Sequence, residues 1–362
     1  MRVALIHDWL TGLRGGEKVL EGLCELFPGA TVFTLVHVPH STSDVIESHP
    51  IRTAFTQKLP GVRKIYRWYL PLYPWAVESL DLEGFDLIVS NSHCVAKGVI
   101  PPRGSVHVCY CLTPMRYVWD RFHDYFGNGW KARWVYGPIA SYLRRWDVAS
   151  ADRVHSFVAD SKYVAARIQN YYGRETEAVI YPPVDTDLFV PGDDEPEDYY
   201  LIVSALVPYK RVDLAIDAFR RRPERLLVVG SGPEERRLRE RASSKVHFLG
   251  NLSQKDLLPL YQRCRATLLP GVEDFGIAPV ESQACGRPVV AFAEGGALES
   301  VRDGETGVFF SESSPEALSD AIDRVSSLRS NRETLRSWAQ GFSRQRFMTE
   351  MRAFVDRKLA GE

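Results

Sequence analysis

The chain has 362 residues, and at about 150 residues per domain this length predicts two domains with a linker or a tail. Hydrophobic residues make up 45% of the chain and charged residues 25%, which is the composition of a globular protein with enough apolar surface for two cores. The formal net charge of −1 argues against bulk DNA as the main partner.

The hydropathy of the chain indicates neither a membrane span nor a signal peptide. No run approaches the ~18 apolar residues of a transmembrane helix, and charged residues come too early for the apolar core of a signal peptide. The 6 cysteines form no C-x-x-C pair and no zinc-binding pattern, so we expect reduced, buried thiols. These features predict a cytoplasmic protein.

Apolar runs alternate with helical patterns along the first half of the chain. The run at 2–6 leads into a glycine-bearing loop and then an amphipathic segment at 17–27, which predicts strand, loop and helix. Further strands are expected at 30–36, 85–90, 106–112, 153–159 and 178–181, and helices at 63–70, 130–149 and 162–172. Strands that alternate with helices predict a doubly wound parallel sheet.

A second alternation begins after an acidic, proline-bearing linker at 191–198. Strands are expected at 200–204, 226–229, 246–249, 266–269 and 288–292, and helices at 211–221, 233–242, 315–328 and 333–359. Two successive α/β sheets joined by a linker predict a ligand site in a cleft between the domains.

Two of the predicted strand-to-helix turns carry groups that suit a phosphate. Gly15 and Gly16 open a helix after the first strand, so their N–H groups can either face an anion or form a plain turn. Lys210 and Arg211 lie between a strand and a helix, at the edge where open α/β sheets bind ligands. A bound diphosphate would meet these cations there; a solvated basic turn is the alternative.

The segment 273–281 carries two glutamates with seven residues between them. Glu273 is expected on a loop after a strand and Glu281 on the following helix, whose N–H groups near Gly276 offer a second anion site. Two carboxylates beside an anion site suit a nucleotide sugar, because they accept hydrogen bonds from sugar and ribose hydroxyls. Two solvated carboxylates are the alternative.

The second half of the chain resembles the second domain of family 4 retaining glycosyltransferases, which have the GT-B fold. The likeness rests on Val-Pro-Tyr-Lys-Arg within 203–219, on the Glu-x7-Glu pattern of 273–286 and on Ala-Glu-Gly-Gly at 293–296. In the first half, Arg-Gly-Gly-Glu-Lys at 14–18 and Cys-Leu-Thr-Pro-Met-Arg-Tyr at 111–117 are similar to the mannosyltransferase-like branch used in O-antigen and exopolysaccharide assembly.

This resemblance implies an α/β chain with two Rossmann-like, doubly wound domains that face each other across a cleft. Residues 1–190 would form an acceptor-side domain and residues 191–343 a nucleotide-sugar-binding domain. A last helix at 344–362 would return to the first domain. Apolar positions at roughly helical spacing in 333–359 agree with a helix that packs against a core.

The resemblance also implies roles for the candidate residues. Glu273 would contact the transferred hexose as the catalytic residue, Lys210 would hold the donor diphosphate, and Glu281 would bind the ribose. The other donor-binding residues would be Gly15, Gly16, Arg211, Phe275, Gly276 and Ile277. Arg116 is expected on the acceptor side. No cofactor and no metal would be needed, because cations and helix N-termini can stabilise the charge on the departing diphosphate.

The implied activity is transfer of a hexose with retention at the anomeric carbon, to a glycan or lipid-linked acceptor in polysaccharide assembly such as that of lipopolysaccharide. GDP-mannose is the favoured donor. Two departures from the family pattern keep alternatives open, because Leu112 stands where many members have histidine and Ala205 where many have arginine. These alternatives are a UDP-hexose-dependent transferase, an enzyme of the UDP-sugar 2-epimerase type, and a weakened or non-catalytic nucleotide-sugar-binding homologue.

A basic and aromatic stretch lies between residues 48 and 77, where five basic residues occur and no acidic one. Arg63, Lys64 and Arg67 stand there among tyrosines and tryptophans. These residue types suit an anionic membrane surface, so we expect peripheral association with the inner face of the cell membrane. For any single residue, an aromatic core under a basic surface is the alternative.

Overall fold

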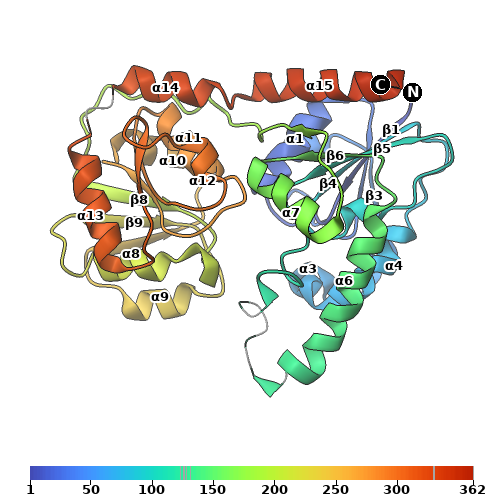
Figure 1. The fold of residues 1–362 in the computed structure, drawn as a ribbon, viewed down its shortest axis with the longest axis horizontal. Coiled ribbons are helices and arrows are strands. Elements are labelled where there is room, and N and C mark those ends of the chain that lie inside the picture. The colour runs from blue at the N-terminus through green and yellow to red at the C-terminus, as the bar shows by residue number, and fades with distance from the viewer. Residues whose placement is uncertain (123, 125–126, 128, 131, 329–330, 362) are drawn as a thin grey trace. The chain divides into compact units, whose positions relative to one another are not determined.

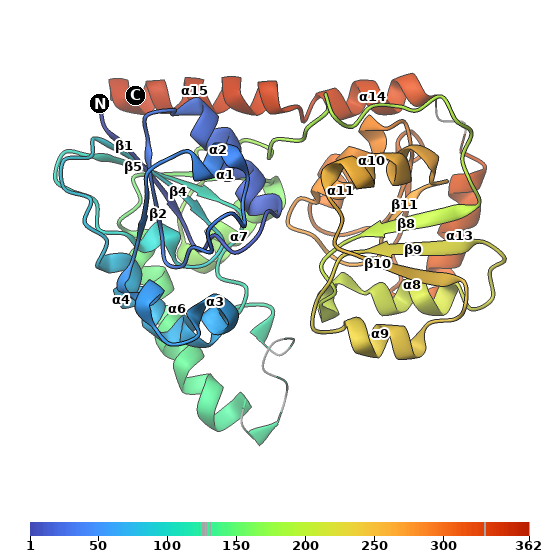
Figure 2. The same ribbon diagram turned by 180° about the vertical axis from the view of Figure 1, so that it is seen from behind.

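The computed structural model describes the chain except for residues 123, 125–126, 128, 131, 329–330 and 362. The chain forms two compact units, each built on one parallel sheet (Figure 1, Figure 2). The first unit contains Met1–Pro183 and Phe347–Glu362, and the second contains Val184–Arg346.

The sheet of the first unit has seven parallel strands in the order β3-β2-β1-β4-β5-β6-β7. These strands are β1 (Val3–His7), β2 (Thr31–Thr34), β3 (Ile51–Thr53), β4 (Leu87–Ser92), β5 (Val106–Cys111), β6 (Ser156–Ala159) and β7 (Ala178–Val179). The α-helices of the unit are α1 (Gly15–Leu26), α2 (Asp44–Glu47), α3 (Val62–Ile65), α4 (Tyr73–Glu78), α6 (Gly137–Ala151), α7 (Lys162–Tyr172) and α15 (Arg344–Ala360). Shorter helical segments are η1 (Phe55–Lys58), η2 (Tyr66–Leu72), η3 (Ala96–Gly98) and η4 (Ala132–Tyr136).

Both faces of this sheet are buried, because side chains along β1 alternate between two cores. Ala4 and Ile6 pack with Phe33 on one face, whereas Leu5 packs with Val32 on the other. A parallel strand that is covered on both faces reads as an unbroken apolar run, which is the pattern the sequence shows there.

The sheet of the second unit has six parallel strands in the order β10-β9-β8-β11-β12-β13. These strands are β8 (Tyr199–Val203), β9 (Arg225–Val229), β10 (Val246–Gly250), β11 (Thr267–Leu269), β12 (Val289–Phe292) and β13 (Gly307–Phe310). The helices of the unit are η5 (Pro208–Lys210), α8 (Val212–Ala218), α9 (Glu235–Arg241), α10 (Gln254–Arg263), α11 (Ile277–Ala284), α12 (Ala297–Ser300), α13 (Pro315–Ser326) and α14 (Arg332–Gln340).

Each sheet reverses its strand order at one place. In the first unit the chain moves outward from β1 in both directions, so β1 and β4 are neighbours although two strands separate them in sequence. In the second unit β8 and β11 are neighbours for the same reason. The carboxyl ends of strands at such a switch point are where open α/β sheets hold ligands.

The division between the units differs from the predicted boundary at residue 190. Val184 pairs with Ser343, and the ring of Phe189 packs edge-on against Tyr261 at 5.5 Å, so residues 184–190 belong to the second unit. The boundary was predicted at the linker because its charge and its prolines are visible in the local sequence. The contacts of Val184 and Phe189 are made with residues far along the chain, and local sequence does not show them.

The predicted helix at 333–359 is two helices, α14 and α15, which are separated near Gly341. The second of them packs on the first unit. Phe347, Met351 and Phe354 are buried in the same core cluster as Leu5. The ring of Phe347 also lies edge-on to Tyr110 of β5 at 5.6 Å.

Two strands, β3 and β13, were not predicted from the sequence. They have 3 and 4 residues and therefore show too little alternation to be recognised.

All six cysteines are buried free thiols, as expected. In the part of the chain that the structure describes, no helix combines the length and the apolar character needed to span a bilayer.

Candidate functional site

Lys210 and Glu273 meet at the switch point of the second sheet. Lys210 ends η5, which follows β8, and Glu273 lies in the loop that follows β11. The Nζ of Lys210 forms an ion pair with Oε1 of Glu273, and the two side chains are only 12% and 18% exposed. The structure therefore brings together the residue that was predicted to hold a diphosphate and the residue that was predicted to contact a sugar.

Close packing between loops positions this pair. A Cβ at Gly271 would overlap the carbonyl oxygen of Tyr209, and a Cβ at Gly296 would overlap that of Asp274. The N–H of Gly296 also donates to the carbonyl oxygen of Glu273 at 2.9 Å. Only glycine allows backbones to approach so closely, so the loops after β8, β11 and β12 hold one another in place.

Glu281 lies on α11 and is buried, with 3% of its surface exposed. The hydroxyl group of Tyr261 on α10 donates a hydrogen bond to its Oε2 at 2.9 Å. Burial raises the pKa of Tyr261, and the charge and hydrogen bond of Glu281 raise it further, so the phenol stays protonated and remains a donor. Sequence reasoning missed Tyr261, because nothing in its local pattern marks it as more than an apolar position of an amphipathic helix.

The other predicted donor-binding residues of the second unit occupy different surroundings. Gly276 and Ile277 form the start of α11. The guanidinium group of Arg211 donates hydrogen bonds to the hydroxyl of Ser313 at 2.5 Å and to the carboxylate of Asp213 at 3.3 Å, rather than to Glu273. The side chain of Phe275 is 2% exposed and packs 5.6 Å from the ring of Phe342. The side chain of Phe275 thus belongs to the core, and the place of this loop beneath a bound ligand stays a prediction.

A second polar group lies at the switch point of the first sheet, where β1 and β4 end. The carboxylate of Asp8 is fully buried and accepts hydrogen bonds from four consecutive backbone N–H groups, at 2.6 to 3.0 Å. These N–H groups belong to residues 93–96. Nδ1 of His93 lies 3.1 Å from Oδ2 of the same carboxylate.

The imidazole of His93 is partly open to solvent, with its side chain 23% exposed. It packs edge-on against Trp9, with ring centroids 4.6 Å apart. Burial lowers the pKa of His93 to about 4, although the charge of Asp8 opposes this shift. The ring is therefore neutral near pH 7.

Gly15 and Gly16 form the start of α1, next to this group. The side-chain amide of Asn91 donates to the carbonyl oxygen of Gly16 at 2.7 Å. His7 lies beside it, with its Nε2 3.7 Å from Oε1 of Glu17. Burial lowers the pKa of His7, but the hydrogen bond and charge of Glu17 outweigh burial and the net shift is upward. Sequence reasoning named the two glycines and missed these polar side chains, which come from three separate segments.

Leu112 and Arg116 complete this edge of the first sheet. A Cβ at Gly16 would lie 3.0 Å from the Cδ1 of Leu112, so the aliphatic side chain lies against the start of α1. Arg116 is half-buried, and its charge contributes to the low pKa of His93, which places the two side chains near each other. The structure thus brings Arg116 to the same edge as Gly15 and Gly16.

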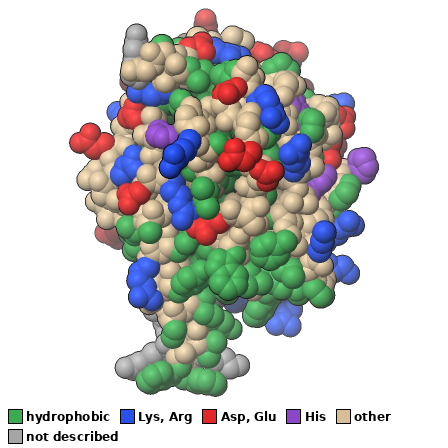
Figure 3. Space-filling model, turned by 90° about the vertical axis from the view of Figure 1, so that its right-hand side faces the viewer, with side chains coloured by type: hydrophobic (Ala, Val, Ile, Leu, Met, Phe, Trp, Pro, Cys, Tyr) green, Lys and Arg blue, Asp and Glu red, His purple; other side chains and the backbone are tan. Residues whose placement is uncertain are grey.

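The basic and aromatic stretch divides into core and surface. Tyr66 and Tyr73 are buried, whereas Trp68 and Trp75 are 74% and 65% exposed. Hydrophobic side chains gather on the lower part of the face shown in Figure 3, where α3, α4 and α6 lie. The side chains of Arg63, Lys64 and Arg67 are exposed, and no carboxylate of the described residues forms an ion pair with them.

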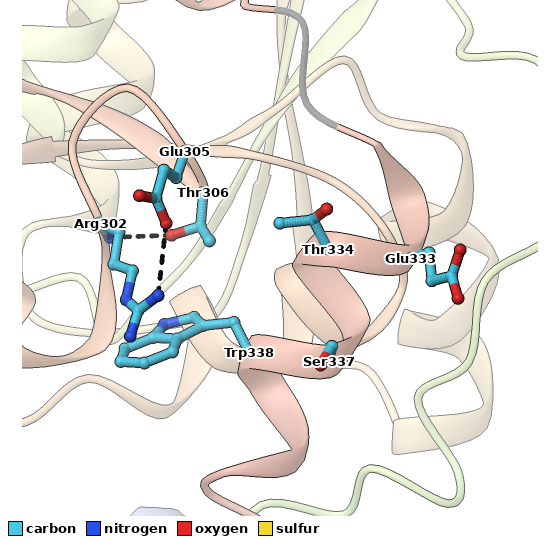
Figure 4. A pocket seen from close by; sticks show the side chains of 7 residues that line it. All are labelled: Arg302, Glu305, Thr306, Glu333, Thr334, Ser337 and Trp338. Atoms are coloured by element: carbon cyan, nitrogen blue, oxygen red, sulfur yellow. Dashed lines mark hydrogen bonds and ion pairs between the residues drawn. The ribbon is translucent and has the colours of Figure 1, made fainter.

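A pocket of about 500 Å³ opens elsewhere on the second unit, between α14 and the turn before β13 (Figure 4). The guanidinium group of Arg302 stacks on Trp338, with Cζ 3.9 Å from the ring centroid, and contacts Glu305 at 3.3 Å. A turn that precedes a parallel strand lies at the amino edge of the sheet. The pocket is therefore at the edge opposite Lys210 and Glu273, and we do not assign it to a nucleotide.

Comparison with known proteins finds a family match within the second unit. Residues 184–341 match the family described as Glycosyl transferases group 1. This part of the chain is therefore similar to that family. The D-inositol 3-phosphate glycosyltransferases of Mycobacterium bovis and Mycobacterium tuberculosis are 34% identical to the chain over 212 aligned residues, and the match covers 52% of this chain and 44% of the relatives. The chain thus spans less than half the length of these curated relatives.

Solved structures match the whole chain in fold. Sucrose-phosphate synthase from Thermosynechococcus elongatus has a TM-score of 0.74 at 19% identity, and Anabaena HepE in complex with UDP has 0.72 at 20%. Each match covers 100% of both chains. The predicted fold class is confirmed: the chain is α/β, with two Rossmann-like domains of the GT-B class. The residues matched by the family model include Lys210, Glu273 and Glu281, whereas Asp8 and His93 lie outside the match.

Proposed function

We propose that this chain is a glycosyltransferase that moves a hexose from a nucleotide sugar to a glycan or lipid-linked acceptor. The observation that carries the proposal is the ion pair of Lys210 and Glu273 at the switch point of the second sheet, with Glu281 buried on the adjoining helix. A cation, two carboxylates and a helix start at one strand edge are the groups that a sugar diphosphate requires.

Each group has a separate task in this proposal. The ammonium group of Lys210 exchanges Glu273 for the diphosphate and stabilises the charge that develops on it as the glycosidic bond breaks. Glu273, released from the lysine, accepts hydrogen bonds from the hexose and lies near the carbon where positive charge develops. Glu281, oriented by Tyr261, binds the ribose hydroxyls. The N–H groups of Gly276 and Ile277 face the phosphates.

The stereochemical course and the metal requirement follow from the family resemblance. We propose that the hexose is transferred with retention and that no metal takes part, because Lys210 and the start of α11 supply the positive charge at the leaving group. We propose that Gly15 and Gly16 of the first unit also bind the donor and that Arg116 lies on the acceptor side.

GDP-mannose is the donor that the mannosyltransferase-like motifs favour. A UDP-hexose is the second candidate, and it is supported by the fold of HepE, whose structure was solved with UDP. An epimerase of the UDP-sugar type would convert its nucleotide sugar without an acceptor. A non-catalytic homologue would bind the donor and transfer nothing.

A thermal-shift screen followed by a transfer assay tests the proposal. GDP, UDP, GDP-mannose and UDP-glucose are added singly, and the accepted nucleotide raises the melting temperature because it binds the native state alone. The Lys210→Met variant should lose this response, whereas Lys255→Met, which removes an exposed lysine of α10, should keep it. Labelled donors are then incubated with and without lipid extract. Transfer that requires the extract supports the proposal; conversion of the donor without acceptor, or binding without turnover, contradicts it.

We further propose that the first unit docks on an anionic membrane through Arg63, Lys64 and Arg67. Three exposed cations beside two exposed tryptophans, Trp68 and Trp75, support this orientation, because tryptophan prefers the lipid–water interface and cations bind anionic headgroups. Such docking would bring a lipid-linked acceptor to the enzyme at the inner face of the cell membrane.

A further inference from the structure

The side chains of Asp8 and His93 form a preorganised pair at the switch point of the first sheet. Asp8 follows β1 directly, and His93 follows β4 directly. This place in the first sheet corresponds to the place of Lys210 and Glu273 in the second, because each pair follows the two strands between which the strand order reverses. The position is where an open α/β sheet binds a ligand.

The carboxylate of Asp8 favours one of the two neutral tautomers of the His93 ring. Asp8 can only accept hydrogen bonds, and its two oxygens already receive four N–H groups from residues 93–96. A lone pair on Nδ1 of His93 would face the lone pairs of this carboxylate at 3.1 Å, so the contact favours the tautomer with the proton on Nδ1. In a neutral ring Nε2 then has a lone pair and no proton, and it lies on the side of the ring away from Asp8.

Two buried histidines of this unit, His7 and His107, do not offer the same group. His107 is fully buried, with Nε2 bonded to the hydroxyl of Ser90 at 2.9 Å and Nδ1 to the carbonyl of Arg153 at 3.2 Å. His7 is also buried, and its Nε2 faces Glu17. Among the described residues, none is bonded to Nε2 of His93, and this ring alone of the three reaches solvent.

We infer that His93, held by Asp8, binds a hydroxyl group of a carbohydrate substrate through Nε2. The hydroxyl donates a hydrogen bond to the unprotonated Nε2, while Trp9 and Asp8 restrict rotation of the ring. Asp8 is a positioning residue, because it acts only through the imidazole. The inference deepens the proposed function by naming the first-unit group that contacts sugar, and the hydroxyl belongs either to the hexose of the donor or to the acceptor.

Nitrogen-detected NMR on protein labelled at histidine tests the contact without relying on turnover. At pH 7 the His93 signals should show the Nδ1–H form. GDP-mannose and UDP-glucose are titrated in turn, then GDP and UDP, and finally methyl α-mannoside and methyl α-glucoside. A shift of Nε2 with a nucleotide sugar but not with the free nucleotide assigns the hydroxyl to the donor; a shift with a methyl glycoside assigns it to the acceptor. An Nε2 signal that responds to none of these sugars overturns the inference, whether or not the chain transfers hexose.

Kinetics provide the second measurement. His93→Leu should lower kcat/KM by about tenfold to a hundredfold, the effect of leaving one substrate hydroxyl without its partner, and His93→Gln should recover part of the loss because its amide oxygen accepts a hydrogen bond. His247→Leu, at an exposed position of β10, is the matched control.

The affinity of His93→Leu for the free nucleoside diphosphate should remain that of the wild type. Equal kcat/KM for His93→Leu and wild type overturns the inference, whereas absence of any transfer or nucleotide binding by the wild type contradicts the proposed function instead.

Asp8→Asn separates positioning from folding. If Asp8 orients the ring, this variant should lose the uniform Nδ1–H signature of His93 while its circular dichroism stays native. A purely structural role for Asp8 would leave the tautomer unchanged in the folded fraction, and that result would remove Asp8 from the inference.

Discussion

The ammonium group of Lys210 contacts the carboxylate of Glu273 between the segments that follow β8 and β11. Both groups are largely shielded from water, so each depends on the other for compensation of its charge. In the proposed function, a diphosphate that binds Lys210 would replace this partner and leave Glu273 free for a hydroxyl-rich ligand. The ion pair would then link nucleotide binding to the availability of the carboxylate.

The first prediction separates the roles of the two candidate glutamates of the second unit. Glu273→Gln should bind the free nucleoside diphosphate no more weakly than the wild type, because that ligand lacks the sugar and Lys210 is no longer neutralised. Its turnover should fall, since the charge near the reacting carbon is lost. Glu281→Gln should weaken nucleotide binding itself by about 1–3 kcal/mol, the value of a charge-assisted hydrogen bond. Calorimetric titration and turnover measured on both variants decide between these effects.

Glu316→Gln, at an exposed position of α13, is the control for loss of a carboxylate. The assignment of the two roles is reversed if Glu273→Gln abolishes nucleotide binding and Glu281→Gln leaves it intact.

The second prediction concerns metal. Transfer measured in excess EDTA should equal transfer in the presence of Mg²⁺, because in the proposed function Lys210 and the start of α11 stabilise the leaving diphosphate. The same protein sample is assayed before chelation, after chelation and after Mg²⁺ has been restored. Activity that disappears with EDTA and returns with the metal would contradict the proposed mechanism.

The third prediction concerns the membrane. Replacing Arg63, Lys64 and Arg67 with glutamate should greatly reduce binding to anionic vesicles, since each cation contributes about 1 kcal/mol near such a surface. Affinity for the nucleotide should not change. A vesicle sedimentation assay in low and high salt makes the comparison.

Glutamate at Arg221, Arg236 and Lys255 gives the same change in charge at exposed positions of the second unit and serves as the control. Equal vesicle binding by the wild type and the first triple variant would leave these residues without a membrane role.

The fourth prediction concerns the buried ion pair of Lys97 and Asp147. The Nζ of Lys97 lies 2.9 Å from Oδ1 of Asp147, and the second carboxylate oxygen accepts hydrogen bonds from Trp119 at 2.8 Å and Tyr172 at 2.9 Å. Lys97→Met leaves this carboxylate buried without its cation, so the free energy of unfolding should fall by about 3–5 kcal/mol. Urea denaturation measures the loss. Combining it with Asp147→Asn should recover much of the stability, and a single variant as stable as the wild type would contradict this assignment.

The fifth prediction concerns acid stability. Burial lowers the pKa of His107 to about 4, below the ordinary histidine value of 6.5, so between these values the unfolded chain binds a proton that the folded chain does not. Stability therefore falls as the pH falls from 6.5 to 4, by about 3 kcal/mol for this one group, and the contribution levels off below pH 4. His107→Gln should be less stable than the wild type at pH 7 and show a shallower decline toward pH 4. Urea titrations at several pH values give the free energy of unfolding of both proteins. An equal decline of this free energy between pH 6.5 and pH 4 in the two proteins would contradict the lowered pKa of His107.

Local patterns predicted most of the secondary structure, because alternation, helical periodicity and glycine turns depend on residues near one another. They failed where an element was short, as for β3 and β13, and where one helical pattern ran across a break near Gly341. Local patterns also predicted the domain boundary at residue 190, whereas the long-range contacts of Val184 and Phe189 place it before residue 184.

The candidate site shows the same division. The spacing of Glu273 and Glu281, and the place of Lys210 after a strand, were evident in the sequence and pointed to an anion site beside two carboxylates. Tyr261 and the pair of Asp8 and His93 were not, because a hydrogen bond between segments far apart leaves no local pattern.

By itself, the sequence determined that this protein has two successive α/β sheets and which loops follow their strands, since both are properties of short segments. Only the tertiary structure decided which strand ends become neighbours. The pairing of β1 with β4 places Asp8 against His93, and the pairing of β8 with β11 places Lys210 against Glu273. Strand order results from how helices cover both faces of a sheet, and this depends on the packing of the whole domain rather than on any one segment.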